Sequence, residues 1–279
     1  MTTLTDTAER FRSLHRSGTP LVLPNAWDVA SARLVEDAGA AAVATSSAGV
    51  AWSLGAPDGD RLDRDRAVDL VARVARAVRV PVSADIENGF AADPAGVAET
   101  IRAVVAAGGV GVNLEDVTYG ADGPALNAIE EQVARIRAAR QAADAAGVPL
   151  YVNARTDVYL LGIGAPDTRL PAVLERAAAY REAGADGIFV PGTTDPDTVA
   201  ALVKGIAAPL NILAGPGAPT VAELAALGVA RVSIGSKLTA AAYGAARRAA
   251  EELLRAGTYG GLAGALDYGS LNRLLSGGR

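Results

Sequence analysis

The sequence predicts an α/β fold, a (β/α)8 barrel of the TIM type. Short apolar runs alternate with helical segments eight times along the 279 residues, and this alternation indicates a parallel sheet covered by helices. Eight strand–helix units in about 250 residues fit a closed barrel. A doubly wound open sheet is the alternative, but the Gly-x-Gly-x-x-Gly turn expected after its first strand is absent. We therefore expect one domain over residues 1–279, with 257–279 as a C-terminal helical tail.

Each element is predicted from its apolar pattern and its end signals. The connections 48–61 and 117–126 are expected to be loops. Strands are expected at 21–24, 41–45, 80–84, 110–114, 150–155, 187–190, 210–213 and 231–234. Helices are expected at 5–17, 28–38, 63–78, 93–107, 127–146, 168–183, 195–204, 220–227 and 237–256. The signals typical of helix starts are Asp28, Asp93-Pro94, Asp195-Pro196, and the capping box of Thr220 with Glu223.

Composition restricts the classes of function. Half of the residues are hydrophobic, which suffices for a large core, and the net charge of −5 argues against a nucleic-acid partner. With no cysteine, the chain has no disulfide or thiolate metal site; this is compatible with a reducing cytoplasm, where we expect the protein. Residues 1–16 lack the apolar run of a signal peptide, and no run approaches the ~20 residues of a membrane span, so we expect no membrane partner.

Two strands end in acidic residues. Asp85 and Glu87 follow the apolar run 80–84, and Glu115 with Asp116 follows the next strand. In an extended chain, residues two apart point to the same face, so the first two carboxylates are expected to aim at one point. Mg²⁺ takes one or two carboxylates and completes its shell with water and substrate oxygens. The pattern therefore predicts a divalent-cation site at the strand ends.

Further polar residues are expected at the same end of the barrel, where TIM-barrel active sites lie. Arg155 is interpreted as a bidentate clamp on a substrate carboxylate, with a structural ion pair as the alternative. Asp58 lies among glycines in the long connection, so a turn role competes with a catalytic one. Trp27 is a candidate wall residue of the substrate site. The complete set at strand ends is Asn25, Ser46, Asp85, Glu87, Glu115, Arg155 and Asn211.

The strand ends carry no histidine, and this absence restricts the reactions that the site can catalyse. His15 is the only histidine and precedes the first strand, so no imidazole is expected at the site. A divalent ion can polarise a carbonyl and stabilise an enolate without a proton-shuttling imidazole. We therefore expect Mg²⁺-dependent chemistry on a small 2-oxo or 2-hydroxy acid. Lys237 as a Schiff-base lysine is a mechanistically different alternative.

The sequence resembles the isocitrate lyase / phosphoenolpyruvate mutase superfamily over residues 21–250. The resemblance implies a (β/α)8 barrel, Mg²⁺ or Mn²⁺, and homo-oligomers, dimers or tetramers, that exchange a C-terminal helix. It also implies that Asp85 ligates the metal, with Glu87, Asp58 and Glu115 near it directly or through water, and that Ser46, Ser47 and Arg155 bind an oxo-acid carboxylate near Asn211. The matching motifs are Asn25 in Pro-Asn-Ala-Trp-Asp, Ser46-Ser47, Leu54-Gly55-x-x-Asp58, Asp85-x-Glu87-x-Gly89, Asn113-Leu-Glu-Asp116 and Asn153-Ala-Arg-Thr-Asp157.

Departures from the family pattern concern the specificity loop. Segment 117–125 has no cysteine, lysine or histidine, so the usual acid of isocitrate cleavage is missing, and Thr118 and Tyr119 are the only stand-ins. Segment 189–192 lacks the glutamate of the methylisocitrate-type pocket.

These departures leave several reactions open. We expect a carbon–carbon lyase acting on a small oxo- or hydroxy-acid with two or three carboxylates through a pyruvate-type enolate, by aldol-type cleavage or by decarboxylation, which needs the fewest loop groups. The catalytic residues would be Asp58, Glu115 and Arg155, and the substrate-binding residues Asn25, Trp27, Ser46, Ser47, Asn211 and Arg155. The alternatives are C–P chemistry of the phosphoenolpyruvate mutase or phosphonopyruvate hydrolase type, and a non-catalytic oxo-acid-binding protein.

Overall fold

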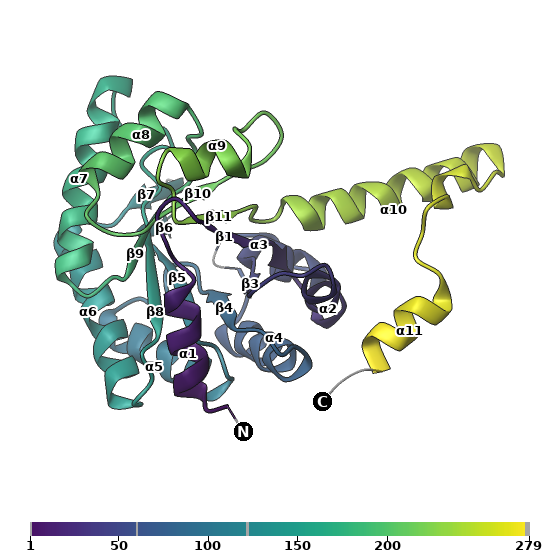
Figure 1. The fold of residues 1–279 in the computed structure, drawn as a ribbon, viewed down its shortest axis with the longest axis horizontal. Coiled ribbons are helices and arrows are strands. Elements are labelled where there is room, and N and C mark those ends of the chain that lie inside the picture. Colours follow the sequence, from purple (N-terminus) through teal and green to yellow (C-terminus); the bar gives the residue numbers. More distant parts are fainter. Residues whose placement is uncertain (1, 60, 121–122, 277–279) are drawn as a thin grey trace.

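A computed structural model describes residues 2–59, 61–120 and 123–276. Its main sheet is parallel throughout and has the order β1-β11-β10-β9-β8-β5-β4-β3-β2. The fold is an α/β barrel of the TIM type, as predicted (Figure 1). The strands are β1 (Leu21–Leu23), β2 (Asn25–Ala26), β3 (Val43–Thr45), β4 (Val82–Asp85), β5 (Gly111–Glu115), β8 (Tyr151–Arg155), β9 (Gly187–Val190), β10 (Leu210–Leu213) and β11 (Arg231–Ser233).

The first barrel strand is divided by Pro24 into two short pieces. β1 pairs with β11 and β2 pairs with β3, so the two ends of the sheet meet at this proline. Proline has no N–H to donate to a neighbouring strand, which explains the break. The Asn25 side chain spans the seam: its Nδ2 donates to the Thr45 carbonyl, and its Oδ1 accepts from the amides of Ile234 and Gly235.

Helices follow the strands and cover the outside of the sheet (Figure 1). The predicted N-caps are present: Asp28 accepts from Ser31 N, Asp93 from Gly96 N, and Asp195 from Thr198 N. Among the described residues the helices are α1 (Leu4–Ser13), α2 (Val29–Asp37), α3 (Ser47–Ser53), α4 (Arg64–Ala77), α5 (Pro94–Ala106), α6 (Ile129–Ala145), α7 (Pro166–Glu182), α8 (Pro196–Gly205), α9 (Val221–Ala226), α10 (Lys237–Ala256), a short 3-10 helix (Gly260–Leu262) and α11 (Tyr268–Ser276).

Two of the predicted loops contain regular structure, which corrects the sequence-based expectation. In 48–61, helix α3 begins after Ser46, whose hydroxyl accepts from Gly49 N, and its Val50 and Ala51 are buried. In 117–126, β6 (Val117–Gly120) and β7 (Gly123–Leu126) form an antiparallel hairpin. Residues 121–122 of this predicted loop lie outside the described residues. Neither element has the long periodic apolar pattern from which helices and strands are recognised.

The barrel interior carries a layer of polar side chains beneath the carboxyl ends of its strands. Asn153 donates to Asn113 Oδ1 at 2.8 Å and to Asn211 Oδ1 at 3.1 Å. Arg231, at the first position of β11, is fully buried and donates to Asn113 Oδ1. At the amino-terminal end, Phe11 of α1 packs against Gly111 and Tyr151, the first residues of their strands.

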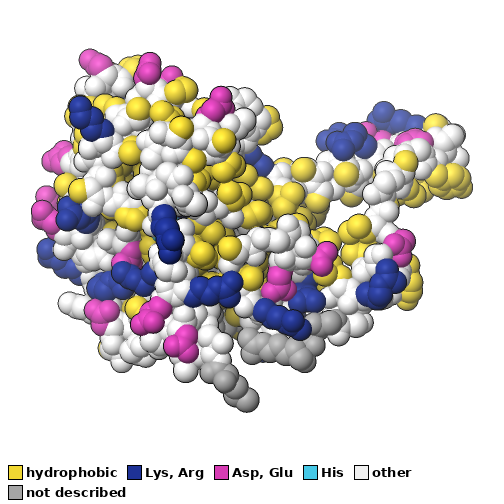
Figure 2. Space-filling model, in the orientation of Figure 1, with side chains coloured by type: hydrophobic (Ala, Val, Ile, Leu, Met, Phe, Trp, Pro, Cys, Tyr) yellow, Lys and Arg dark blue, Asp and Glu magenta, His cyan; other side chains and the backbone are white. Residues whose placement is uncertain are grey.

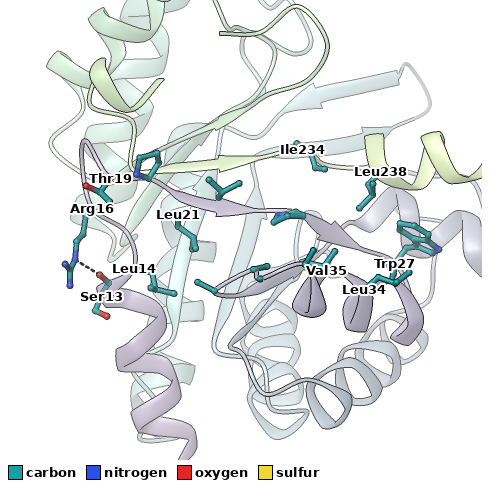
Figure 3. Close-up of a pocket in the computed structure, with 18 of the residues that line it drawn as sticks. Ser13, Leu14, Arg16, Thr19, Leu21, Trp27, Leu34, Val35, Ile234 and Leu238 are labelled. Atoms are coloured by element: carbon teal, nitrogen blue, oxygen red, sulfur yellow. Dashed lines mark hydrogen bonds between the residues drawn. The ribbon is translucent and has the colours of Figure 1, made fainter. Parts of the chain in front are cut away.

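Helix α10 leaves the barrel as an arm, and α11 returns toward α2 (Figure 1). Of the 20 residues of α10, only Thr239 is buried. Beside the base of the arm lies an apolar cavity of about 1000 Å³, between the end of α1, β1 and α2. Leu14, Leu34, Trp27 and Leu238 are among its lining residues (Figure 3). Figure 2 shows hydrophobic side chains gathered between the barrel and this arm. The predicted tail 257–279 contains two short helices as expected, and its residues 277–279 lie outside the described range.

Candidate active site

Asp85 is the last residue of β4 and marks the centre of the candidate site. Its Oδ2 accepts from the amide of Ser47 at 2.9 Å, and its own amide donates to Thr45 Oγ1 at 2.9 Å. The backbone amide at the start of α3 therefore orients the carboxylate, and the Thr45 side chain of β3 fixes the backbone that carries it. Asp85 is only partly buried, which leaves it accessible to a bound molecule.

Glu87 reaches the site by a turn. The strand ends at Asp85, and Glu87 has φ 49°, so the extended geometry that motivated the prediction does not continue. Gly89 N donates to the Ile86 carbonyl and closes the turn, while Glu115 N donates to the Glu87 carbonyl. Glu87 is nevertheless buried beside Glu115, whose pKa it helps to raise. Glu87 and Asp85 therefore both act on Glu115, and Glu87 does so from a turn rather than from an extended strand.

Arg155, at the end of β8, joins two carboxylates. Its Nε and Nη2 donate to Asp157 Oδ1 and Oδ2 at 2.6 and 2.7 Å, and its Nη1 lies 2.7 Å from Glu115 Oε2. The guanidinium has five N–H donors. Three are used here, so one N–H on each terminal nitrogen is left for a ligand. The pair of N–H groups predicted to hold a substrate carboxylate, on Nε and Nη2, thus contacts Asp157, which was not among the predicted site residues.

Two acids of the site, Glu115 and Asp58, have raised pKa values. Burial raises the pKa of Glu115; the Arg155 charge opposes this, and the carboxylates of Asp157, Asp85 and Glu87 add to it. Partial burial raises the pKa of Asp58, and the Asp85 carboxylate raises it further. Negative charges held this close favour a cation or protons between them. Asp58 therefore belongs electrostatically to the same site, although it keeps a solvent-exposed face.

The arrangement fits a divalent ion held partly through water. Within the described residues, no three carboxylate or imidazole groups converge closely enough to hold a metal by themselves. Mg²⁺ commonly uses one or two protein carboxylates and keeps several waters. Asp85 is the accessible carboxylate, and Asp58, Glu87 and Glu115 interact with it or with one another. When bound, such an ion would stabilise negative charge on a substrate oxygen.

Tyr119 of the hairpin covers one side of the site. Its ring lies so close to Gly59 that a Cβ there would be 3.3 Å from Tyr119 Cε1. Gly59 has φ 90°, a conformation that glycine tolerates and other residues rarely adopt. Burial raises the pKa of the Tyr119 hydroxyl, and the charges of Glu115 and Asp58 raise it further, so the phenol is a neutral donor. Thr118 and Tyr119 were the two candidates to replace the missing loop groups. Tyr119 is the one that contacts Gly59, the residue after Asp58.

Several predicted substrate residues have structural partners. Asn25 is committed to the barrel seam. Asn211 is the second residue of β10 and lies inside the barrel, where it accepts from Asn153 and donates to Ser233 Oγ, so it is not at a strand end as expected. Trp27 lines the apolar cavity beside α10, edge-on to Tyr243. Ser46 caps α3 with its hydroxyl.

The alternative catalytic residue Lys237 and the histidine His15 lie elsewhere. His15 stacks on Tyr151, 3.8 Å between ring centroids, at the amino-terminal end of the barrel; burial lowers its pKa to about 3. Lys237 begins α10, is exposed, and extends along Gly215. Neither contacts the acidic cluster in any described interaction.

Asp116 is a buried residue whose role the sequence did not reveal. Its Oδ2 accepts from Tyr180 and Arg176 at 2.7 and 3.0 Å, and its Oδ1 accepts from the amide of Asp157. It thereby fixes the backbone that carries the partner of Arg155. The adjacency of Glu115 and Asp116 was the available signal, because alternate strand residues face opposite sides of a sheet.

Comparison with known proteins places this geometry in context. Residues 11–254 match the phosphoenolpyruvate phosphomutase family. An uncharacterized protein of Mycobacterium tuberculosis (strain H37Rv) is 42% identical over 241 residues, 86% of this chain and 87% of that protein. An oxaloacetate decarboxylase of Pseudomonas aeruginosa (strain UCBPP-PA14) is 32% identical, and the match covers 88% of this chain and 83% of that protein.

Among the described residues, every helix is too short or too polar to span a lipid bilayer.

Solved structures agree with the sequence relatives. A putative lyase/mutase from Burkholderia cenocepacia J2315 has 45% identity and a TM-score of 0.89, covering 97% of this chain and 95% of its own. A phosphonopyruvate hydrolase in complex with oxalate and Mg²⁺ has 29% identity and a TM-score of 0.84, covering 97% and 95%. A 2,3-dimethylmalate lyase has 27% identity and a TM-score of 0.82, covering 98% and 94%. The chain belongs to the phosphoenolpyruvate phosphomutase family, within the phosphoenolpyruvate mutase / isocitrate lyase superfamily.

Proposed function

We propose that this protein is an Mg²⁺- or Mn²⁺-dependent carbon–carbon lyase that decarboxylates a small 2-oxo dicarboxylate of the oxaloacetate type through a pyruvate-type enolate. The observation that carries the proposal is the grouping of Arg155 with Glu115 and Asp157, beside Asp85, at the carboxyl ends of neighbouring strands. The related oxaloacetate decarboxylase and dimethylmalate lyase support the reaction class.

Some side chains of the site would bind the substrate carboxylate, and others would hold the divalent ion. The two unused N–H groups of Arg155 would hold the carboxylate next to the carbonyl, together with the hydroxyl of Ser47. Asp85 would be the direct ligand of the ion, with Asp58, Glu87 and Glu115 contacting it through water. A bound divalent ion would polarise the carbonyl and stabilise the charge that develops on its oxygen when the C–C bond breaks.

The hairpin residue Tyr119 suits decarboxylation better than an aldol cleavage. Its phenol stays neutral at ordinary pH, since its pKa is raised. A neutral phenol adds no negative charge beside the enolate and would shield it from bulk water. Loss of CO₂ requires no acid at this position, because the leaving group takes no proton. Aldol-type cleavage of a 2-hydroxy tricarboxylate requires an acid there to protonate the departing carbanion, and the described part of the hairpin has no lysine, histidine or cysteine to supply it.

The test is a substrate panel assayed with and without EDTA. Purified protein is given oxaloacetate, 2,3-dimethylmalate, methylisocitrate or phosphonopyruvate, and release of 2-oxo acid, CO₂ and phosphate is followed separately. We expect fast pyruvate and CO₂ release from oxaloacetate, abolished by EDTA and restored by Mg²⁺. Because oxaloacetate decarboxylates slowly with free metal ions, Asp85→Asn serves as the matched control.

Each other outcome points to a different function. Phosphate release from phosphonopyruvate would favour C–P chemistry, and binding of oxalate with no turnover would favour a binding protein. Activity that survives chelation but is trapped by borohydride would favour Lys237 as a Schiff-base residue. Any of these results would contradict the proposed decarboxylase.

We further propose that the active form is a homo-oligomer in which subunits exchange α10. Support comes from the exposed apolar side chains of the arm and from the apolar cavity of about 1000 Å³ beside its base. A second copy of α10 would cover that cavity with apolar residues. Tyr243, Leu253 and Leu254 on α10 are exposed by 42, 47 and 84%. A cytoplasmic location remains a prediction from the cysteine-free composition.

A further inference from the structure

The turn that carries Glu87 is held in an unfavourable backbone conformation. Glu87 and Phe90 have φ values of 49° and 51°, which non-glycine residues seldom adopt, and Gly89 between them has φ 98°. Such conformations persist only where the surrounding structure enforces them, and they gather at functional sites. The groups that enforce this turn are therefore informative about the site.

A single buried arginine on α6 binds one carbonyl group of the turn and two of the segment that follows it. Arg135 Nη1 donates to the carbonyls of Asn88 and Ala91 at 3.2 and 2.9 Å, and its Nη2 donates to that of Ala92 at 2.7 Å. The residue is 4% exposed. Glu131, one helical turn earlier, accepts from Arg135 Nε and Nη2, so the guanidinium is fixed in orientation.

A second helix contributes another side-chain donor to the same turn. Thr100 of α5 donates through Oγ1 to the Gly89 carbonyl at 2.7 Å and is fully buried. Helices α5 and α6 lie side by side outside the barrel (Figure 1). Together they hold the carbonyls on the outer side of the turn while the Glu87 carbonyl accepts from Glu115 N on its inner side.

We infer that Arg135 is a positioning residue that sets the Glu87 carboxylate for divalent-cation binding. The inference rests on the proposed function, because it assumes an ion near Asp85 and Glu87. Arg135 itself contacts carbonyl groups of the turn and Glu131, so its effect on the ion is indirect. Without it, the buried Asn88 carbonyl and the less buried carbonyls of Ala91 and Ala92 lose their donor, and the turn can relax away from Glu115. Groups that orient metal-binding carboxylates typically change metal affinity by roughly 10- to 100-fold.

The experiment measures Mn²⁺ affinity by the electron paramagnetic resonance signal of the free ion. Arg135→Met is compared with Arg140→Met, a matched control on the same helix. Arg140 also binds backbone carbonyls, those of Leu150 and Gly184, and pairs with Asp186, but these lie before the strands at the opposite end of the barrel. Melting temperatures of both variants are measured alongside.

We expect Arg135→Met to bind Mn²⁺ roughly 10- to 100-fold more weakly, while Arg140→Met loses thermal stability but keeps wild-type affinity. Equal affinity in wild type and Arg135→Met, or equal weakening in both variants, would overturn the inference. If Arg135→Met does not fold, Thr100→Val takes its place, with weaker binding expected and unchanged binding contradictory. Wild-type protein that binds no Mn²⁺ would instead overturn the metal site, and the proposed function with it.

Discussion

At the scale of single residues, most hydrogen-bonding groups of the site are already paired within the protein. Only a few remain to bind a substrate or an ion. Arg155 gives three of its five N–H groups to Asp157 and Glu115, and Asp85 gives one oxygen to the Ser47 amide. The remaining lone pairs and N–H groups all belong to rigid side chains at strand ends. Preorganised groups of this kind stabilise developing charge without reorganising during the reaction.

Arg155→Lys tests the geometric role of the guanidinium. Lysine keeps the positive charge but cannot contact Asp157 through two parallel donors while also reaching Glu115. We expect kcat/KM for the oxo acid to fall by about 10- to 100-fold, the size expected for losing one hydrogen bond to a charged group. Steady-state kinetics with Arg255→Lys, at the exposed end of α10, provide the control. Unchanged kcat/KM would mean that Arg155 is only a structural ion-pair partner.

Glu115 makes the stability of the metal-free protein depend on pH. Burial raises its folded-state pKa above the ordinary value of 4.5, so the folded state keeps a proton that the unfolded chain releases. Stability should therefore fall as pH rises from 4.5 through the raised pKa. Urea unfolding at a series of pH values measures this. Saturating Mg²⁺ should flatten the dependence, and Glu115→Gln should remove it; the same slope in that variant would disprove the assignment.

At the scale of elements, the sequence predicts regular parts of the barrel well. The strands at 187–190 and 210–213 have the predicted bounds, as does the helix at 237–256, because apolar runs and cap residues are local signals. The hairpin 117–126 and helix α3 were missed, since both are short and neither has a long periodic apolar pattern. The Glu87 turn was missed because Arg135 and Thr100, which hold it, lie on later helices.

The seam of the barrel gives a prediction about stability. Asn25→Ala removes two acceptor contacts to the amides of Ile234 and Gly235 and one donor contact to Thr45. Leaving partly buried amides without an acceptor should lower the free energy of unfolding by about 1–3 kcal/mol. Urea denaturation measures the change, with Val22→Ala on the exposed face of β1 as the control. Equal stability of the two variants would show that the seam needs no side-chain bridge.

At the scale of the whole molecule, the arm formed by α10 has few packing contacts with the barrel. It exposes apolar side chains that the barrel does not cover, and large exposed apolar surfaces usually mark interfaces. Its direction could not be predicted from the sequence, because the amphipathic pattern of a helix does not say which chain supplies its partner. Assignment of residues 1–279 to one domain likewise remains a prediction.

Light scattering coupled to size exclusion tests the proposed exchange of α10. Wild-type protein should have the mass of a dimer or tetramer, and the double variant Leu253→Glu with Leu254→Glu should shift toward monomer because two charges would have to be buried. Circular dichroism should show that the barrel persists in this variant. Monomeric wild-type protein at micromolar concentration would argue against the exchange.

Calorimetric titration of Mg²⁺ in the presence of oxalate tests the central claim most directly, since oxalate mimics the enolate that the site is proposed to stabilise. The account predicts one ion bound per chain, no binding in Asp85→Asn, and retained binding in the distant control Arg255→Lys. Saturable binding that is equal in wild type and Asp85→Asn, or no binding in wild type, would contradict the claim that these strand-end carboxylates share one divalent ion.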